Sequence, residues 1–269
     1  MSEAKPGRAH LVTGGFPAGS MGGHDHDYVR LKLLGLLAER DIPASVGNDF
    51  ADLEKWLAVS RLLITYVAGP YPDAAQTEEI RRWLESGGRW LALHGTSGGR
   101  AQRVEGARMR RTVKSEHHAL LGGFFLIHPP IREFRVDVAP IASPLTQGLG
   151  TSFVVEDEPY FVELQDPAST QILLTAEFGP TAADVTNGLY PSDTSLLADG
   201  KTRVLGYSKD VGEGGVTYFA LGHSHNPAIR AARANADPAD KTPPIFRVPW
   251  ETEAFVTLLR NAVAWGIRA

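Results

Sequence analysis

The stretch WLALHGTSGG, residues 90–99, decides the fold that this sequence predicts. An apolar run is followed at once by His94, and then by a turn that is rich in glycine. This pattern is typical of a buried strand that ends in a sharp elbow, where an α/β enzyme presents a reactive side chain. We therefore expect His94 to occupy the elbow. The alternative is an ordinary loop at a strand end, with a histidine that has no chemical role.

Strand and helix signals alternate on the N-terminal side of this stretch. Apolar, β-rich runs predict strands at residues 10–12, 44–46, 61–67 and 90–93. Helices are expected between them, at residues 28–40, 52–59 and 73–85, and Asp27 is the expected N-cap of the first helix. This alternation predicts a mostly parallel central sheet with right-handed crossovers, in an α/β fold.

The C-terminal side is less regular and predicts additional β-strands. Strands are expected at residues 124–127, 132–138, 152–155, 171–178, 202–207 and 216–221, and helices at 112–121 and 250–266. Residues 179–200 and 226–249 read as insertions, because both are long for simple connections. No low-complexity linker divides the chain, so residues 1–269 are expected to form one domain.

Composition excludes several classes of function. The 269 residues include no cysteine, which rules out disulfides, thiolate metal sites and a cysteine nucleophile. The net charge of −4 gives no electrostatic footprint for nucleic acid or for an anionic membrane. The sequence has neither a long apolar run nor the apolar core of a signal peptide, so a cytoplasmic protein is expected.

Three further motifs follow the elbow in a recognisable order. They are LGGFFLIHPPIREFRV at residues 121–136, VVEDEPY at 154–160 and VTYFALGHSHNP at 216–227. Together with the elbow, they resemble the ThuA-like, or trehalose utilisation, family of the class I glutamine amidotransferase-like superfamily. The resemblance implies a flavodoxin-like three-layer sandwich and a role in the metabolism of trehalose, other disaccharides or keto-sugars. Amidotransferases of this superfamily place a cysteine at the elbow, so glutaminase activity is excluded here.

The resemblance brings forward four candidate catalytic residues: His94, His128, Glu158 and His223. Three histidines and a carboxylate suit general acid–base chemistry near neutral pH. They also suit a divalent metal, which is the only candidate cofactor, with the three histidines as its ligands. The alternatives are a ring of His128 that caps a strand before Pro129, and a solvated acidic loop around Glu158.

Five residues are candidates for substrate binding: His24, His26, Tyr71, Thr96 and Tyr160. The two histidines belong to GGHDHDY, residues 22–28, on a loop that follows the first strand and should point toward the site. The glycines before them do not form the Gly-x-Gly-x-x-Gly pattern that opens a helix in dinucleotide-binding proteins, so nucleotide binding is unsupported.

Two functional hypotheses remain at this point, and a purely structural role is a third option. The first is an enzyme, a hydrolase, lyase or isomerase, that acts on a small sugar in a histidine-rich pocket at the carboxyl ends of the strands. The second is a non-catalytic sugar-binding or interaction protein on an amidotransferase-like scaffold. A homo-oligomer is compatible with both, and the insertion at 226–249 could serve as a lid or as a dimer arm.

Overall fold

The computed structural model describes residues 7–15, 23–105, 110–180, 189–228 and 243–268. Its centre is a nine-stranded sheet in the order β2-β1-β3-β4-β13-β12-β11-β8-β9. The first five strands in this order pair in parallel, and the remaining four pairings are antiparallel. The nine strands are β1 (Ala9–Gly15), β2 (Ala44–Gly47), β3 (Leu62–Ala68), β4 (Arg89–Leu93), β8 (Arg132–Val138), β9 (Ser152–Asp157), β11 (Thr170–Glu177), β12 (Thr202–Val211) and β13 (Gly214–Phe219).

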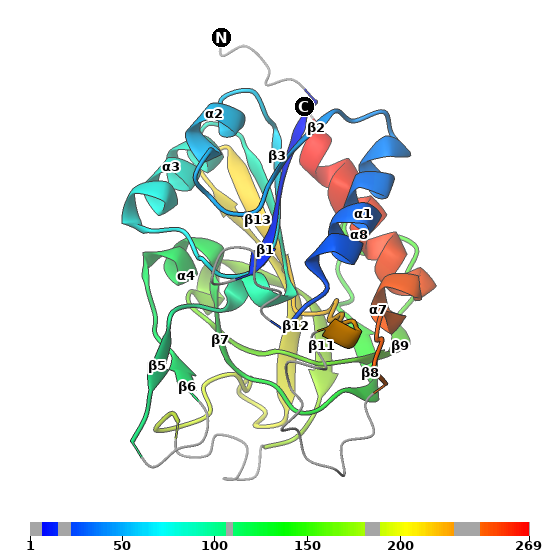
Figure 1. The fold of residues 1–269 in the computed structure, drawn as a ribbon. Helices are drawn as coiled ribbons and strands as arrows, with labels where there is room; N and C mark the ends of the chain where they lie inside the picture. The colour runs from blue at the N-terminus through cyan, green and yellow to red at the C-terminus, as the bar shows by residue number, and fades with distance from the viewer. Residues whose placement is uncertain (1–6, 16–22, 106–109, 181–188, 229–242, 269) are drawn as a thin grey trace.

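Helices cover both faces of the parallel half of the sheet. Helices α1 (His26–Ala38) and α8 (Glu253–Ile267) lie side by side on one face, and α2 (Leu53–Leu57) and α3 (Ala74–Glu85) lie on the other (Figure 1). The main hydrophobic core runs through both halves, since one contiguous cluster joins strands β1, β3 and β4 to β11, β12 and β13. The predicted α/β sandwich with additional C-terminal strands is therefore confirmed.

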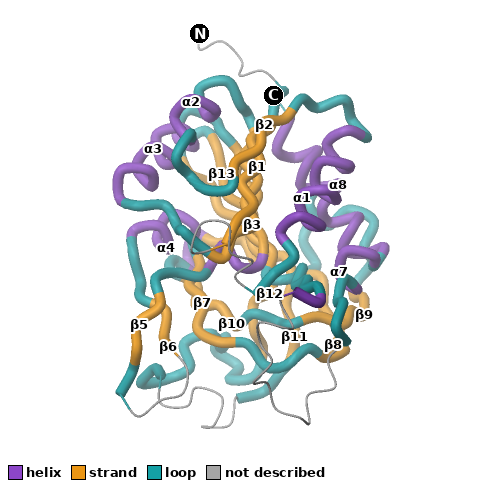
Figure 2. Tube along the Cα trace, viewed as in Figure 1, coloured by secondary structure: helices purple, strands orange, loops and turns teal. Residues whose placement is uncertain are grey.

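Shorter elements complete the fold, and strands β5, β6, β7 and β10 lie outside the nine-stranded sheet (Figure 2). Strands β7 (Gly123–Ile127) and β10 (Phe161–Leu164) form a two-stranded sheet, and β5 (Ala101–Arg103) pairs with β6 (Arg110–Thr112). The remaining helices are α4 (Glu116–Leu121), α7 (Val248–Glu251) and two 3-10 turns, η1 (His94–Ser97) and η2 (Pro167–Ser169). The sequence patterns predicted none of β5, β6 and β10.

The first helix begins earlier than expected, and its N-cap differs. Asp25, not Asp27, caps α1, because its carboxylate accepts a hydrogen bond from the Tyr28 backbone N–H at 3.3 Å. Asp27 lies in the first turn instead and pairs with Arg30. The prediction of Asp27 as the N-cap was therefore wrong. An acidic residue at either position stabilises a helix N-terminus, and sequence alone could not separate them.

Two other helices are shorter than the patterns predicted. The helix expected at residues 112–121 begins only at Glu116, because Ser115 forms a capping box with His118. The helix expected at 250–266 is divided into α7 and α8 at Thr252, whose backbone is extended. Of the two expected insertions, residues 181–188 and 229–242 lie outside the described residues. No helix among the described residues is long and apolar enough to span a membrane.

Candidate functional site

The site is assembled where strands β4 and β13 end side by side. Leu93 at the end of β4 pairs with Phe219 on the parallel strand β13, so the residues that follow both strands emerge at the same edge. His94 follows β4 directly, and His223 follows β13 after a short turn. Neighbouring strand ends thus bring together two histidines that lie far apart in the sequence.

His94 occupies the elbow that the sequence predicted. Its backbone φ is +41°, which is uncommon for a residue other than glycine. The next residue must be small, because a Cβ atom at Gly95 would lie 2.5 Å from the Val67 carbonyl oxygen. The Nδ1–H of His94 donates to the Ala220 carbonyl oxygen at 2.8 Å. Complete burial lowers the pKa of His94 to about 3, so its ring is neutral at physiological pH.

Asp157, at the end of β9, fixes the loops that carry two candidate residues. Its carboxylate accepts the backbone N–H groups of Gly222 at 2.7 Å, His223 at 3.0 Å and Glu158 at 2.7 Å. Burial raises the pKa of the Asp157 carboxyl, and the three N–H donors oppose that rise. Asp157 therefore holds Glu158 and His223 against each other rather than facing the site itself.

Glu158 is the centre of the cluster. Its Oε1 lies 3.1 Å from Nδ1 of His128, while its Oε2 lies 3.3 Å from Nδ1 of His223 and 4.0 Å from Nε2 of His94. Burial lowers the pKa of His223 well below its usual value, and the neighbouring histidines add to this effect. The four predicted catalytic residues thus meet around one carboxylate, and their catalytic roles stay predictions.

His24 joins this cluster, although the loop before it is mostly outside the described residues. His24, His94, Glu158 and His223 each offer one ligand atom, and these atoms all lie within 4.8 Å of one another. This set could hold a metal ion. The metal ligands expected from the sequence were His94, His128 and His223, so this set contains His24 where His128 was expected. His128 instead contacts Oε1 of Glu158.

Tyr160 forms one wall of the cluster. Its ring lies against that of His94, with the centroids 3.8 Å apart, and its hydroxyl is 3.4 Å from Nε2 of His24. The rings of Phe125 and Tyr160 both lie near that of His128, at 6.0 and 5.5 Å. Aromatic surface therefore borders the side of the cluster where His128 lies.

Three predicted substrate-binding residues do not join the cluster. His26 is buried on α1 against Tyr66, and Thr96 uses its hydroxyl to bind the Thr65 carbonyl oxygen at 2.9 Å. Tyr71 donates to the Gly95 carbonyl oxygen and lines a separate cavity of about 730 Å³ beyond the ends of β3 and β4. Substrate binding by these residues remains a prediction.

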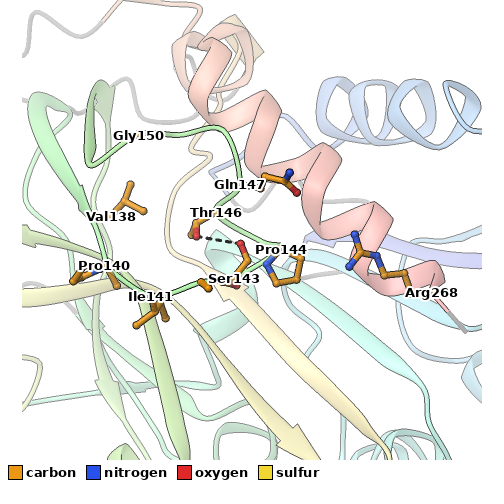
Figure 3. A pocket seen from close by; sticks show the side chains of 11 residues that line it. Val138, Pro140, Ile141, Ser143, Pro144, Thr146, Gln147, Gly150 and Arg268 are labelled. Carbon is orange, nitrogen blue, oxygen red and sulfur yellow. Dashed lines mark hydrogen bonds between the residues drawn. The ribbon is translucent and has the colours of Figure 1, made fainter.

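Another cavity lies away from the cluster. It has a volume of about 620 Å³ and is formed mainly by the loop after β8, with Arg268 at its edge (Figure 3). Within it, the Thr146 hydroxyl donates to the Ser143 carbonyl oxygen. None of the residues that the sequence singled out lines this cavity.

The sequence predicted no role for His225, which proves to be part of the site. It is buried, and its Nδ1 lies 3.0 Å from Nε2 of His223. Its own Nε2–H donates to the Pro243 carbonyl oxygen at 2.8 Å. The only signal in the sequence was its alternation with His223 in the motif His-Ser-His, which places both rings on the same side of an extended segment.

The sheet, the elbow and the residues gathered around it define an α/β protein that carries a histidine at the elbow and a group of histidines around one carboxylate. The ThuA family model, described as trehalose utilisation, matches residues 21–234, so the chain belongs to this family.

Solved structures support the same fold. A ThuA-like protein from Parabacteroides merdae is 15% identical with a TM-score of 0.60, over 98% of this chain and 90% of that chain. A ThuA-like protein from Bacteroides uniformis is 17% identical with a TM-score of 0.57, over 83% and 85% of the two chains. At these identities the likeness shows the fold alone. The comparison with curated proteins found no match.

Proposed function

We propose that this protein binds a sugar at the Glu158 cluster and transforms it by proton transfer, with His128 as the proton-transfer group. One observation carries the proposal: Nδ1 of His128 lies 3.1 Å from Oε1 of Glu158. The same nitrogen lies 3.1 Å from the Pro129 carbonyl oxygen, which can only accept, so Nδ1 carries the proton. Nε2 is then the basic nitrogen, and the carboxylate orients the ring as in other histidine–carboxylate pairs.

Accessibility distinguishes His128 from the other histidines of the cluster. Its side chain is 29% exposed, whereas those of His94 and His223 are 0% and 1% exposed. A substrate can therefore reach His128 directly. The ring of Phe125, which is only partly buried, lies beside that of His128 and adds an apolar surface that suits the C–H face of a sugar ring.

The substrate class follows from the family and from the chemistry of one imidazole base. Trehalose utilisation indicates a carbohydrate. A C–H bond of an unmodified sugar is too weak an acid for imidazole, but a carbonyl group next to that carbon makes proton removal feasible. A keto-sugar is therefore the preferred substrate. The base removes the proton, and the electron pair enters an enolate. Where the carbon that lost the proton carries a hydroxyl, transfer of the hydroxyl proton to the enolate oxygen and return of a proton at the former carbonyl carbon move the carbonyl and give an isomer. Where the enolate instead expels a leaving group, with its bonding electrons, from the carbon next to the one that lost the proton, the result is elimination.

Glycoside hydrolysis fits the site less well. Most glycosidases need two reactive carboxyl groups on either side of the bond that breaks. Glu158 is one such group, but the carboxylate of Asp157 is already occupied by three backbone N–H donors. Asp25, beside His24, is engaged by Arg247 at 2.8 Å and by the N-terminus of α1. An isomerase or a lyase is therefore preferred to a hydrolase.

Incubation in deuterated water tests this function. The substrates are trehalose, other disaccharides and their keto derivatives, and NMR follows deuterium entry at the carbon beside the carbonyl. We expect exchange or product with a keto-sugar, and a loss of at least about 100-fold in His128→Gln. The control is His10→Gln, which makes the same chemical change at a histidine that lies at the start of β1, away from the strand ends.

The outcomes separate the two hypotheses. Absence of exchange and of product with every keto-sugar contradicts proton transfer. Thermal stabilisation by a sugar without any product supports the non-catalytic binding protein instead, because a ligand stabilises the state that binds it whether or not it reacts.

A further inference from the structure

The geometry points to a divalent transition-metal ion held by His24, His94, Glu158 and His223. The use of this ion on a sugar rests on the proposed function, but its binding does not. Four residues from different parts of the chain supply the site: the loop before α1, the elbow after β4, the residue after β9 and the turn after β13.

The hydrogen bonds of His94 fix which of its nitrogens is free to bind a metal. Its Nδ1 lies 2.8 Å from the Ala220 carbonyl oxygen, which can only accept, so Nδ1 carries the proton. The ring is neutral, and Nε2 therefore presents a lone pair. This nitrogen is buried and has no hydrogen-bond partner. A carbonyl that fixes the tautomer of a histidine in this way is usual behind metal-binding imidazoles.

His225 fixes the tautomer of His223 in the same manner. The Nε2–H of His225 donates to the Pro243 carbonyl oxygen, so Nδ1 is the nitrogen of His225 that faces His223 and accepts the hydrogen bond from its Nε2–H. The remaining nitrogen of His223, Nδ1, then presents a lone pair. It is also buried without a hydrogen-bond partner. His225 is thus a positioning residue that acts on the site through His223.

Both lone pairs face the same carboxylate oxygen. Oε2 of Glu158 lies 3.3 Å from Nδ1 of His223 and 4.0 Å from Nε2 of His94. Three electron-rich atoms so close together repel one another unless a cation lies between them. Tetrahedral ligands with bonds of about 2.1 Å lie roughly 3.4 Å apart, close to these separations. A metal ion therefore fits with small side-chain movements.

The donor atoms indicate the class of metal. Three imidazoles with one carboxylate suit Zn²⁺, Co²⁺ and similar ions, whereas Ca²⁺ and Mg²⁺ prefer sites made of oxygen. Glu158 serves both functions of the site, since Oε2 faces the ion and Oε1 orients His128. The ion would lie next to the proposed proton-transfer group, where it could polarise a substrate carbonyl.

Titration of the chelator-treated full chain with Co²⁺ tests the site without any sugar. We expect one ion per chain by native mass spectrometry, and visible absorption typical of nitrogen coordination. His94→Gln and His223→Gln should each weaken binding at least about 100-fold. His26→Gln is the matched control and should change affinity less than about threefold, because His26 is buried next to His24 but outside the set.

The role of His225 has its own test. His225→Leu should weaken Co²⁺ binding by about 10- to 100-fold, the usual effect of losing such a partner. His225→Gln should retain more affinity, because its amide oxygen can still accept from His223. Equal affinity in His225→Leu and the wild type would overturn this assignment.

The metal site itself is overturned by either of two results. One is the absence of Co²⁺ and Zn²⁺ binding to the wild-type chain, and the other is an equal loss in His26→Gln and His94→Gln. Bound metal without sugar turnover would contradict the proposed function and leave the metal site standing. Turnover by a metal-free chain would support the proposed function and contradict the use of the ion.

Discussion

Asp157 shows how one buried side chain can determine a site without facing it. Its two oxygens accept three backbone N–H groups and so fix the positions of Glu158 and His223. We expect Asp157→Asn to lower the free energy of unfolding by about 1–3 kcal/mol, because the amide has one acceptor oxygen fewer and leaves a buried N–H unpaired. Urea denaturation measures this change.

The neighbouring strand position offers a matched control for that substitution. Glu156→Gln changes an exposed carboxylate on the same strand, and should alter stability by less than about 0.5 kcal/mol. Equal effects of the two substitutions would show that the buried hydrogen bonds of Asp157 do not hold the loops.

His10 gives a prediction of pH dependence at a residue far from the site. Burial lowers the pKa of His10 to about 4, from 6.5, against the opposing hydrogen bond from Ser45. The unfolded chain therefore binds more protons between these two pH values, so stability falls as the pH drops from about 6.5 to about 4. One such group changes the free energy of unfolding by at most about 1.4 kcal/mol per pH unit.

The variant His10→Gln isolates this contribution, because glutamine does not titrate and can still bind Ser45. We expect a shallower fall of stability in the variant over this pH range, with no difference in slope above pH 7. Urea denaturation at several pH values supplies the comparison, and parallel curves for the two proteins would contradict the assignment.

At the scale of an element, the buried side chain of Arg203 on β12 attaches the segment at 179–200 to the sheet. Arg203 pairs with Asp193 at 2.8 Å, while its guanidinium lies 3.8 Å from the centre of the Phe161 ring. It also donates to the Gly179 carbonyl oxygen at 3.1 Å. This one side chain therefore ties the described ends of the insertion at 179–200 to the antiparallel part of the sheet.

Arg203→Met should lower the free energy of unfolding by about 3 kcal/mol, because it leaves the partner carboxylate without its buried cation. The control is Arg135→Met on β8, whose pair with Asp137 is exposed, and whose loss should cost less than about 1 kcal/mol. Thermal unfolding compares the two variants. A similar small effect of both would show that the insertion is held by other contacts.

The structural elements that could be predicted from the sequence were those that local periodicity determines. Apolar runs located β3, β4 and α3, and the glycine-rich turn located the elbow at His94, because these signals depend only on neighbouring residues. Strand β10 was not predicted, since its pairing with β7 joins segments more than thirty residues apart. The start of α1 depended on whether Asp25 or Asp27 turned its side chain toward the backbone, which periodicity does not encode.

The sequence predicted which residues belong to the site, but not how they are arranged. The family resemblance identified His94, His128, Glu158 and His223, but only the pairing of β4 with β13 shows that the first and last meet. The proposed metal-binding set contains His24 where the sequence predicted His128, because Nδ1 of His128 contacts Oε1 of Glu158, whereas His94 and His223 approach Oε2. His225 acts through a hydrogen bond to His223, and such a role has no distinct sequence signal.

At the scale of the whole molecule, the sheet joins a parallel and an antiparallel half at β13, and the candidate site lies beyond the ends of β13 and its parallel neighbour β4. A chain of 269 residues is long enough for its halves to unfold separately. One contiguous hydrophobic core crosses the junction, however, and we therefore expect one cooperative transition in denaturant. Far-UV circular dichroism and tryptophan fluorescence should give coincident curves.

Metal binding should shift that transition as a whole. His94 comes from the parallel half, Glu158 from the end of antiparallel β9, and His223 from the turn after β13, so an ion bound by all three stabilises both halves together. An ion present at 100 times its dissociation constant should add about 2.7 kcal/mol to the free energy of unfolding. The two spectroscopic curves should then move by the same amount. Movement of one curve alone would show that the halves unfold independently and that the ion is held within one of them.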